Sequence, residues 1–226
     1  MCIKKRTINF FLKNLCLSIF MLLGIIGFSQ QKIKEGDLLF QDLNCGDLCN
    51  AIEAVTKGVE GKNFSHCAIV VKMSDSLKVV EAIGSNVQLI SLKHFFARSG
   101  DTNFIKNITI ARLSNKYKSI IKNATIFALA NIGKPYDDEF VMNDDKFYCS
   151  ELIYEAFKAA NNQKDFFTLA PMTFKDPSTK LYFPAWVDYY KFLNKTIPEG
   201  KPGINPGLIS RSKKINIIKI EKFKQD

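Results

Sequence analysis

The sequence predicts an α+β fold in which helices pack on a small antiparallel sheet. Apolar residues recur at helical spacing after Ser114 and again after Cys149. Short apolar runs bounded by turn residues have the length and composition of strands: 38–40, 64–71, 79–83, 107–113 and 215–220. Helices interspersed among strands of this kind are typical of the α+β class.

The central strands are expected to form a hairpin. Residues 64–71 and 79–83 flank a turn around Ser74-Asp75-Ser76. Strict alternation in the first of these strands would place Phe64, His66, Ala68 and Val70 on one face.

Capping residues and glycines set the expected helix limits. A helix over 47–57 would end at Gly58, and Ser91 would cap a short helix that carries His94. Ser114 would cap a helix that ends before Gly133, and the helix that starts near Cys149 has an apolar stripe reaching Ala160. Residues 170–210 have weak periodicity and are expected to form an ordered wrapping segment.

The N-terminal stretch has the pattern of a signal peptide. Four basic residues precede an uncharged run over 15–28. This run is shorter than the ~20 apolar residues of a membrane span. Small residues at 27–29 favour cleavage near Ser29 or Gln30, so residues 1–29 are predicted to be removed and 30–226 to form one domain. An uncleaved membrane anchor is the alternative. The expected location is the periplasm or cell envelope.

The charge pattern does not favour nucleic acid as a partner. The whole chain has a net charge of +10, which falls to +6 when the four basic residues of the first 29 positions are removed. The remaining lysines are scattered and no basic stripe is interleaved with aromatic residues. Contact with an anionic membrane surface or the cell wall stays open.

Four cysteines remain after the signal peptide: Cys45, Cys49, Cys67 and Cys149. An exported protein could pair Cys45 with Cys49, but within a helix an i, i+4 spacing brings the two side chains only loosely together. The CxxxC spacing lacks matching histidines, so we expect no metal, and no motif indicates an organic cofactor.

Cys149 is the candidate nucleophile because it stands in the first turn of a helix. Free amide groups and the helix dipole stabilise a thiolate there, and the same amides can hold the oxyanion of an attacked carbonyl. The alternative is a small buried cysteine that fills a gap in the core.

A thiol nucleophile needs a base, and two histidines are available. His66 lies on the apolar face of a strand, where it is either a base or a core histidine bonded to a carbonyl. His94, beside Lys93, is expected on the surface, so His66 is the predicted base.

Glu81 is the candidate residue to orient His66. A turn centred on Ser74 and Asp75 makes His66 and Glu81 diagonal neighbours on one face, whereas a shift of one residue would send Glu81 to the other face. A solvent-facing Glu81 on an edge strand is the alternative.

Six segments in order, GDLLFQ, FSHCAIV, VVEA, KPYD, FYCSEL and PGINPG, resemble the permuted NlpC-type papain-like hydrolases of the YiiX/YaeF-like group over residues 36–210. The histidine precedes the cysteine, as this permuted group implies. The resemblance implies a papain-like fold with a small antiparallel sheet packed against the nucleophile helix. It also implies that Cys149 is the nucleophile, His66 the base and Glu81 the acidic third member.

Further residues are assigned by the resemblance or by position. Tyr136 and Asp137, in the KPYD motif, would bind substrate, although a plain turn capped by Asp137 is an equal alternative. Gln41 could donate to the oxyanion, and Ser150, next to the nucleophile, is assigned to substrate binding. Cys67 replaces a small aliphatic residue of relatives; it is expected to be buried and to point to the strand face opposite His66.

These residues predict an exported cysteine hydrolase that cleaves an amide bond through an acyl-enzyme. Its substrate would be an envelope peptide, an N-acyl amino acid or a peptidoglycan stem. Two alternatives stay open: a lipid acyltransferase or esterase, whose lipid pocket the aromatic residues of 164–192 would line, and a non-catalytic envelope binding module.

Overall fold

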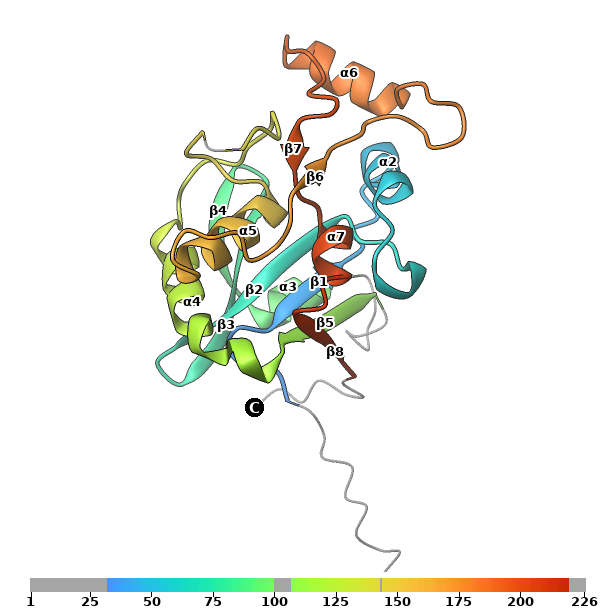
Figure 1. Cartoon of the computed structure of the whole chain (residues 1–226). Coiled ribbons are helices and arrows are strands. Elements are labelled where there is room, and N and C mark those ends of the chain that lie inside the picture. Colours follow the sequence, from blue (N-terminus) through green and yellow to red (C-terminus); the bar gives the residue numbers. More distant parts are fainter. Residues whose placement is uncertain (1–31, 100–106, 143, 220–226) are drawn as a thin grey trace, which may run out of the picture. The chain divides into compact units, whose positions relative to one another are not determined.

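The computed structural model describes residues 32–99, 107–142 and 144–219, which belong to one compact unit (Figure 1). The predicted signal peptide lies outside the described residues. The main sheet has six strands, all antiparallel to their neighbours, in the order β4-β3-β2-β1-β5-β8. Its strands are β1 (Leu38–Gln41), β2 (His66–Met73), β3 (Ser76–Ile83), β4 (Asn86–Ser91), β5 (Ile108–Leu113) and β8 (Ile215–Ile218).

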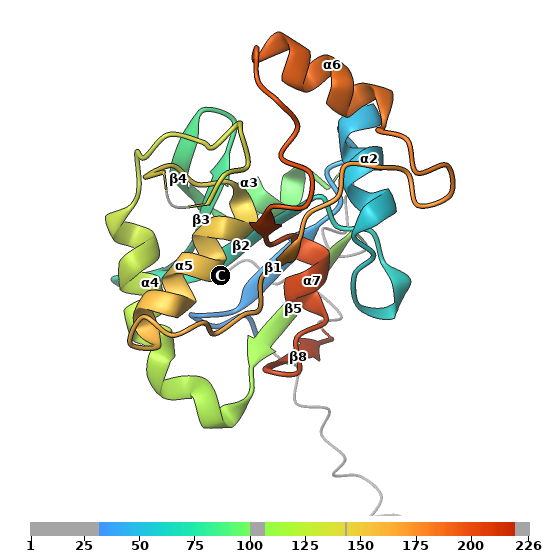
Figure 2. The same ribbon diagram turned by 45° about the horizontal axis from the view of Figure 1, so that its top comes forward.

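Helices cover both faces of this sheet (Figures 1 and 2). The α-helices are α2 (Asp47–Val55), α3 (Leu92–Ala97), α4 (Ile121–Ala130), α5 (Cys149–Ala160), α6 (Pro184–Phe192) and α7 (Pro206–Ser210). Two 3-10 helices, η1 (Val59–Gly61) and η2 (Asn115–Ile120), and a two-stranded ladder of β6 (Ala170–Pro171) with β7 (Pro202–Gly203) complete the unit. This arrangement confirms the predicted α+β class with an antiparallel sheet.

Alternate residues of β2 belong to two separate cores. Cys67, Ile69 and Val71 pack with α4, α5 and α7 in the larger core. Ala68 and Val70 pack with α3 in the smaller core on the other face. The position of the sheet between these helices therefore buries β2 on both sides.

The central hairpin has the predicted register. Met73 pairs with Ser76 and Ile69 with Val80, so the turn contains Ser74 and Asp75. The predicted start of the strand at Phe64 is wrong, because the chain bends at Ser65 and β2 begins at His66. Phe64 consequently packs in the larger core and does not share a face with Ala68 and Val70.

The helix predictions hold best where an apolar stripe faces the sheet. Helix α5 covers the predicted stripe, and Ser91 caps α3 by accepting a hydrogen bond from the His94 amide. The helix predicted from Ser114 begins instead as η2, and the Ser114 side chain makes no cap hydrogen bond. Strand β4 and the helices α6 and α7 were not predicted. The helices α6 and α7 lie in a segment without a clear period, and β4 was not recognised as the partner of β3 in a second hairpin.

Cys45 and Cys49 form a disulfide with their Cα atoms 5.3 Å apart. The expectation of only loose proximity assumed that both residues are helical. Cys45 in fact precedes α2, and Gly46 between the cysteines has a positive φ of 82°. The turn before the helix therefore brings the thiols together.

None of the helices in the described ranges is both long and apolar enough to cross a membrane.

Candidate active site

The site begins at the N-terminus of α5. Tyr148 is the N-cap residue with extended backbone angles, and Cys149 is the first residue of the helix. The apolar stripe of α5 packs in the core that also contains Cys67 and Ile69 of β2. Only 7% of Cys149 is exposed. The packing of α5 on the sheet thus fixes the sulfur beside the start of β2.

His66, the first residue of β2, bonds to Glu81 across the hairpin. The His66 Nε2 atom lies 2.7 Å from Glu81 Oε2, and both side chains are buried. Because Nε2 meets the carboxylate, Nδ1 is the ring nitrogen left to face the sulfur. The ring of Phe95, on α3, lies 6.0 Å from the imidazole ring between centroids and shields it from solvent.

Two further side chains hold the Glu81 carboxylate. Gln88 Nε2 donates to Oε1 at 2.9 Å, and the Arg98 guanidinium donates to Oε2 at 2.5 Å. Gln88 stands opposite Glu81 in the ladder of β3 with β4. Burial opposes ionisation of Glu81, but His66 and Arg98 outweigh it and lower its pKa to about 2. Glu81 is therefore an anion with a fixed orientation.

The sequence reasoning missed Gln88 and Arg98. Gln88 could have been found by continuing the alternation through a second hairpin, since β4 places it directly beside Glu81. Arg98 follows α3, and its approach to Glu81 depends on how that helix packs on the sheet. Nothing in the local pattern signals that approach.

The thiol and the imidazole perturb each other in the directions expected of an ion pair. The Cys149 sulfur accepts hydrogen bonds from the Cys67 thiol and from His66, which lower its pKa far below the ordinary thiol value although burial raises it. Burial also opposes protonation of His66, but Cys149 and Glu81 outweigh it and raise the pKa of His66 to about 9. At neutral pH a thiolate and an imidazolium therefore stand side by side.

Cys67 belongs to the site. It is buried and faces away from the Ala68 side of the sheet, as predicted, but α5 packs on the face to which it points. Its thiol and its backbone amide both donate to the Cys149 sulfur. Burial and the neighbouring Cys149 raise the pKa of the Cys67 thiol, so Cys67 stays a neutral donor.

A cavity of about 120 Å³ opens at Cys149. Tyr136 and Ser150, which the sequence assigned to substrate binding, line it. The Ser150 hydroxyl donates to the carbonyl of Ile204 at 3.0 Å, so its side chain is engaged in structure. Of the aromatic residues between 164 and 192, Phe174 and Trp186 line this cavity.

Three other predicted residues lie outside this cavity. Gln41 is buried, and its amide group donates to the carbonyl of Phe95 at 3.2 Å. Asp137 accepts from the amides of Glu139 and Val141, which is the turn-capping alternative. His94 is exposed on α3, as expected.

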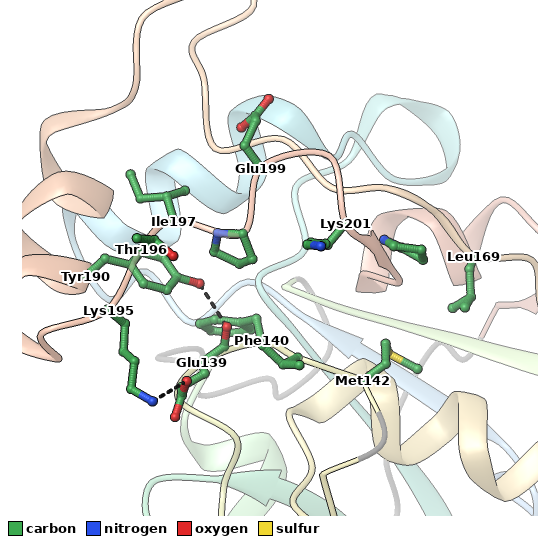
Figure 3. Close-up of a pocket in the computed structure, with 13 residues that line it drawn as sticks. Glu139, Phe140, Met142, Leu169, Tyr190, Lys195, Thr196, Ile197, Glu199 and Lys201 are labelled. Carbon is green, nitrogen blue, oxygen red and sulfur yellow. Dashed lines mark hydrogen bonds and ion pairs between the residues drawn. The ribbon is translucent and has the colours of Figure 1, made fainter.

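A larger cavity of about 640 Å³ lies between the loop 139–142 and the segment 195–202 (Figure 3). Lys195 forms an ion pair with Glu139 at 3.0 Å at its edge, and Tyr190 donates to the Glu139 carbonyl. The two cavities share Phe140, whose ring packs against Tyr148 and Trp186. Since Cys149 does not line the larger cavity, the chemistry belongs to the smaller one.

Comparisons with known proteins identify a family and similar folds. Residues 32–219 match the family model described as "Permuted papain-like amidase enzyme, YaeF/YiiX, C92 family". The chain is 27% identical to the uncharacterized protein YiiX of Escherichia coli K12 over 149 residues, which are 66% of this chain and 69% of that protein. The crystal structure of metalloprotein yiiX from Escherichia coli O157:H7 is similar with a TM-score of 0.66 at 20% identity, over 85% of this chain and 99% of that one.

Metalloprotein is a description of that Escherichia coli protein. Within the described ranges of this chain, no three His, Cys, Asp or Glu side chains lie together as metal ligands.

Proposed function

The chain belongs to the YaeF/YiiX family of permuted papain-like amidases, and on that premise we propose that it hydrolyses an amide bond through an acyl-enzyme on Cys149. Membership in the family makes the protein a cysteine hydrolase of the amidase or peptidase type. The proposal of an acyl-enzyme on Cys149 rests on one observation: Glu81 and His66 make a buried contact beside a thiolate at the start of α5.

The reaction starts with attack of the Cys149 thiolate on the carbonyl carbon. Amides in the first turn of α5, which no helical carbonyl satisfies, face the developing oxyanion. The His66 imidazolium gives its proton to the nitrogen of the leaving amine as the carbon–nitrogen bond breaks. His66 then takes a proton from water, and the resulting hydroxide attacks the thioester, releasing the acid and restoring the thiolate.

Glu81 keeps His66 in one orientation through this cycle. Its carboxylate accepts from Nε2 and stabilises the imidazolium, while Gln88 and Arg98 prevent it from rotating. The carboxylate therefore acts on the substrate only through His66.

The proposal includes export to the cell envelope. The Cys45–Cys49 disulfide supports it, because disulfides persist in oxidising compartments. In that location the available substrates are amides of envelope peptides, amino acids or cell-wall stems, and contact with the membrane surface or cell wall fits the positive charge of 30–226.

Thiol labelling tests the proposal directly. At neutral pH, iodoacetamide should alkylate Cys149 in the folded protein and leave Cys67 unmodified, and Cys149→Ala should abolish hydrolysis of every amide that the wild type cleaves. Circular dichroism checks that the variant is folded. Activity that persists in Cys149→Ala would contradict the proposal.

A further inference from the structure

We infer that the cavity at Cys149 selects the acyl part of the substrate, and that it takes a short, uncharged, apolar acyl group of about four to six carbons. This inference rests on the proposed amide hydrolysis and names its substrate class. It is drawn from the lining, the size and the position of the cavity.

Apart from the Cys149 thiolate itself, the lining carries no charge that could pair with a charged substrate. Among the described residues that border the cavity there is no Asp, Glu, Lys, Arg or His. Apolar side chains of α2, α6 and the segments around β6 and α7 contribute to the lining, together with uncharged polar side chains. The apolar ones are Ile52, Val55, Pro171, Met172, Trp186 and Pro206, and the polar ones include Thr56, Ser65, Thr173 and Asn205. A carboxylate bound here would lose its hydration without gaining a cationic partner, which costs several kcal/mol by order of magnitude.

The cavity is open to solvent, and its size sets how much of an acyl group it can cover. Its volume is about 120 Å³. An apolar protein cavity of roughly 150 Å³ binds benzene, so about four to six carbons fill this one. The rings of Phe174 and Trp186, packed edge to face with centroids 5.0 Å apart, stand in its lining. A long lipid chain would extend beyond the cavity.

The position of the cavity identifies which half of the amide occupies it. Cys149 and Ser150 line the cavity, whereas His66 contributes nothing to its surface. His66 must lie next to the leaving amine, because it delivers the proton to that nitrogen. The half of the substrate that enters the cavity is therefore the acyl half, which stays bonded to Cys149 after the amine departs.

The first test measures kcat/KM for p-nitrophenyl esters and p-nitroanilides of the same straight-chain acids. Because each buried methylene contributes about 0.8 kcal/mol, kcat/KM should rise roughly fourfold per methylene from acetyl to about hexanoyl and then level off. Succinyl substrates should react at least about a hundredfold more slowly than pentanoyl ones, which have nearly the same size. Equal rates for the two, or a continued rise to dodecanoyl, would overturn the inference.

Variants on α2 test whether the cavity itself sets this limit. Ile52 and Val55 are half-buried and line the cavity, and neither packs against the two cores of the main sheet. Ile52 packs against the separate cluster of Ala51, Phe174, Trp186 and Tyr190. Ile52→Ala should move the plateau to longer chains, and Val55→Phe should move it to shorter ones. Val187→Ala, at an exposed position of α6 outside the lining, should keep the wild-type profile. An unchanged plateau in both cavity variants would contradict the assignment.

The esters separate failure of this inference from failure of the proposed function. Mass spectrometry of the intact protein detects acylation of Cys149 whichever acyl group is preferred. If no ester acylates Cys149 and no amide is cleaved, the proposed hydrolysis itself is wrong. If Cys149 is acylated and the amides are cleaved, but charged or long acyl groups react best, only the inference about the acyl group is wrong.

Discussion

Cys149 is held as a thiolate by three hydrogen-bond donors that come from one strand. The Cys67 thiol, the Cys67 amide and the His66 imidazole all lie at the start of β2. His66 is in turn held by Glu81 from β3. A buried anion of this kind depends on every donor, so single substitutions should have measurable and distinct effects.

Substitution of the two histidines separates the base from the surface residue. His66→Ala should lower kcat/KM by at least about a thousandfold, because the thiolate loses both its counter-ion and the proton donor for the amine. Glu81→Gln should cause a smaller loss, since the imidazole can still reach the sulfur, and His94→Ala should be near wild type. Steady-state kinetics on proteins shown to be folded checks this. Loss of activity in His94→Ala with retention in His66→Ala would refute the assignment.

The pH dependence of the activity follows from the ion pair of Cys149 with His66. The active form needs a deprotonated Cys149 and a protonated His66. The lowered pKa of Cys149 places the acidic limb of kcat/KM well below the ordinary thiol range, and the raised pKa of His66 places the alkaline limb at about pH 9. Activity should therefore fall as pH rises through about 9. An alkaline limb near the ordinary histidine value of about 6.5 would show that the pair is not formed.

Cys67 should lower the pKa of Cys149 without being alkylated itself. Cys67→Ala removes a donor to the Cys149 sulfur and should raise the pKa of Cys149, so the rate of iodoacetamide alkylation should reach its half-maximum at a higher pH than in the wild type. Cys67→Ser keeps a donor of similar size and should stay closer to the wild type. Identical profiles for all three proteins would show that Cys67 only fills space.

Secondary-structure elements position the site through a few close contacts. Helix α7 and the residue before it border the cavity with Pro206 and Asn205. Next to them, Gly207 packs against the segment that follows α2, and Ser210 accepts a hydrogen bond from the Val59 amide at 3.0 Å. These contacts hold the C-terminal part of the chain against the segment that follows α2, the helix on the other side of the cavity.

Gly207→Ala should destabilise this contact. A Cβ atom at position 207 would lie 2.0 Å from the carbonyl oxygen of Thr56, and a backbone oxygen cannot move aside as a flexible side chain can. We expect a loss of about 1–3 kcal/mol in the free energy of unfolding, measured by chemical denaturation. Arg211→Ala, at an exposed position after the same helix, is the control. Equal stability of both variants with the wild type would contradict the close packing.

Sequence reasoning succeeded for elements whose own pattern determines them. The stripe of α5 and the two-residue turn of the hairpin are local features, and the structure has both. A turn centred on Ser74 and Asp75 makes Glu81 a neighbour of His66, but the sequence alone left open a register shifted by one residue. Contacts that depend on packing were not predictable. Arg98 reaches Glu81 because α3 folds back on the sheet, and Cys67 touches Cys149 because α5 lies on that face.

At the scale of the whole molecule, the two cavities differ in charge. The larger one has charged residues at its edge, among them Glu139, Lys195, Glu199 and Lys201, whereas the one at Cys149 has, in the described part of the chain, no charged group besides the Cys149 thiolate. An ion pair between a lysine and a carboxylate at a cavity edge is readily solvated, so polar groups of a ligand can lie beside it. Selection for apolar groups is therefore confined to the immediate surroundings of the nucleophile.

Export is the prediction that concerns the entire chain. Residues 1–29 carry the basic lead and apolar run of a signal peptide, and the disulfide of Cys45 with Cys49 requires an oxidising compartment. The full chain expressed in a secreting bacterial host should yield a protein that begins near Gln30 or Gln31, shown by N-terminal mass mapping. Under non-reducing conditions its Cys45 and Cys49 should resist alkylation.

The matched control is the same protein lacking 1–29, expressed in the cytoplasm. Its Cys45 and Cys49 should be reduced and alkylated, because glutathione and thioredoxin keep cytoplasmic thiols reduced. Cys149 should react in both forms, since its thiolate depends on β2 and α5 and not on the compartment. Recovery of residues 1–28 in the native full-length protein would contradict cleavage and indicate a retained membrane anchor. Alkylation of Cys45 and Cys49 in both forms would contradict export to an oxidising compartment.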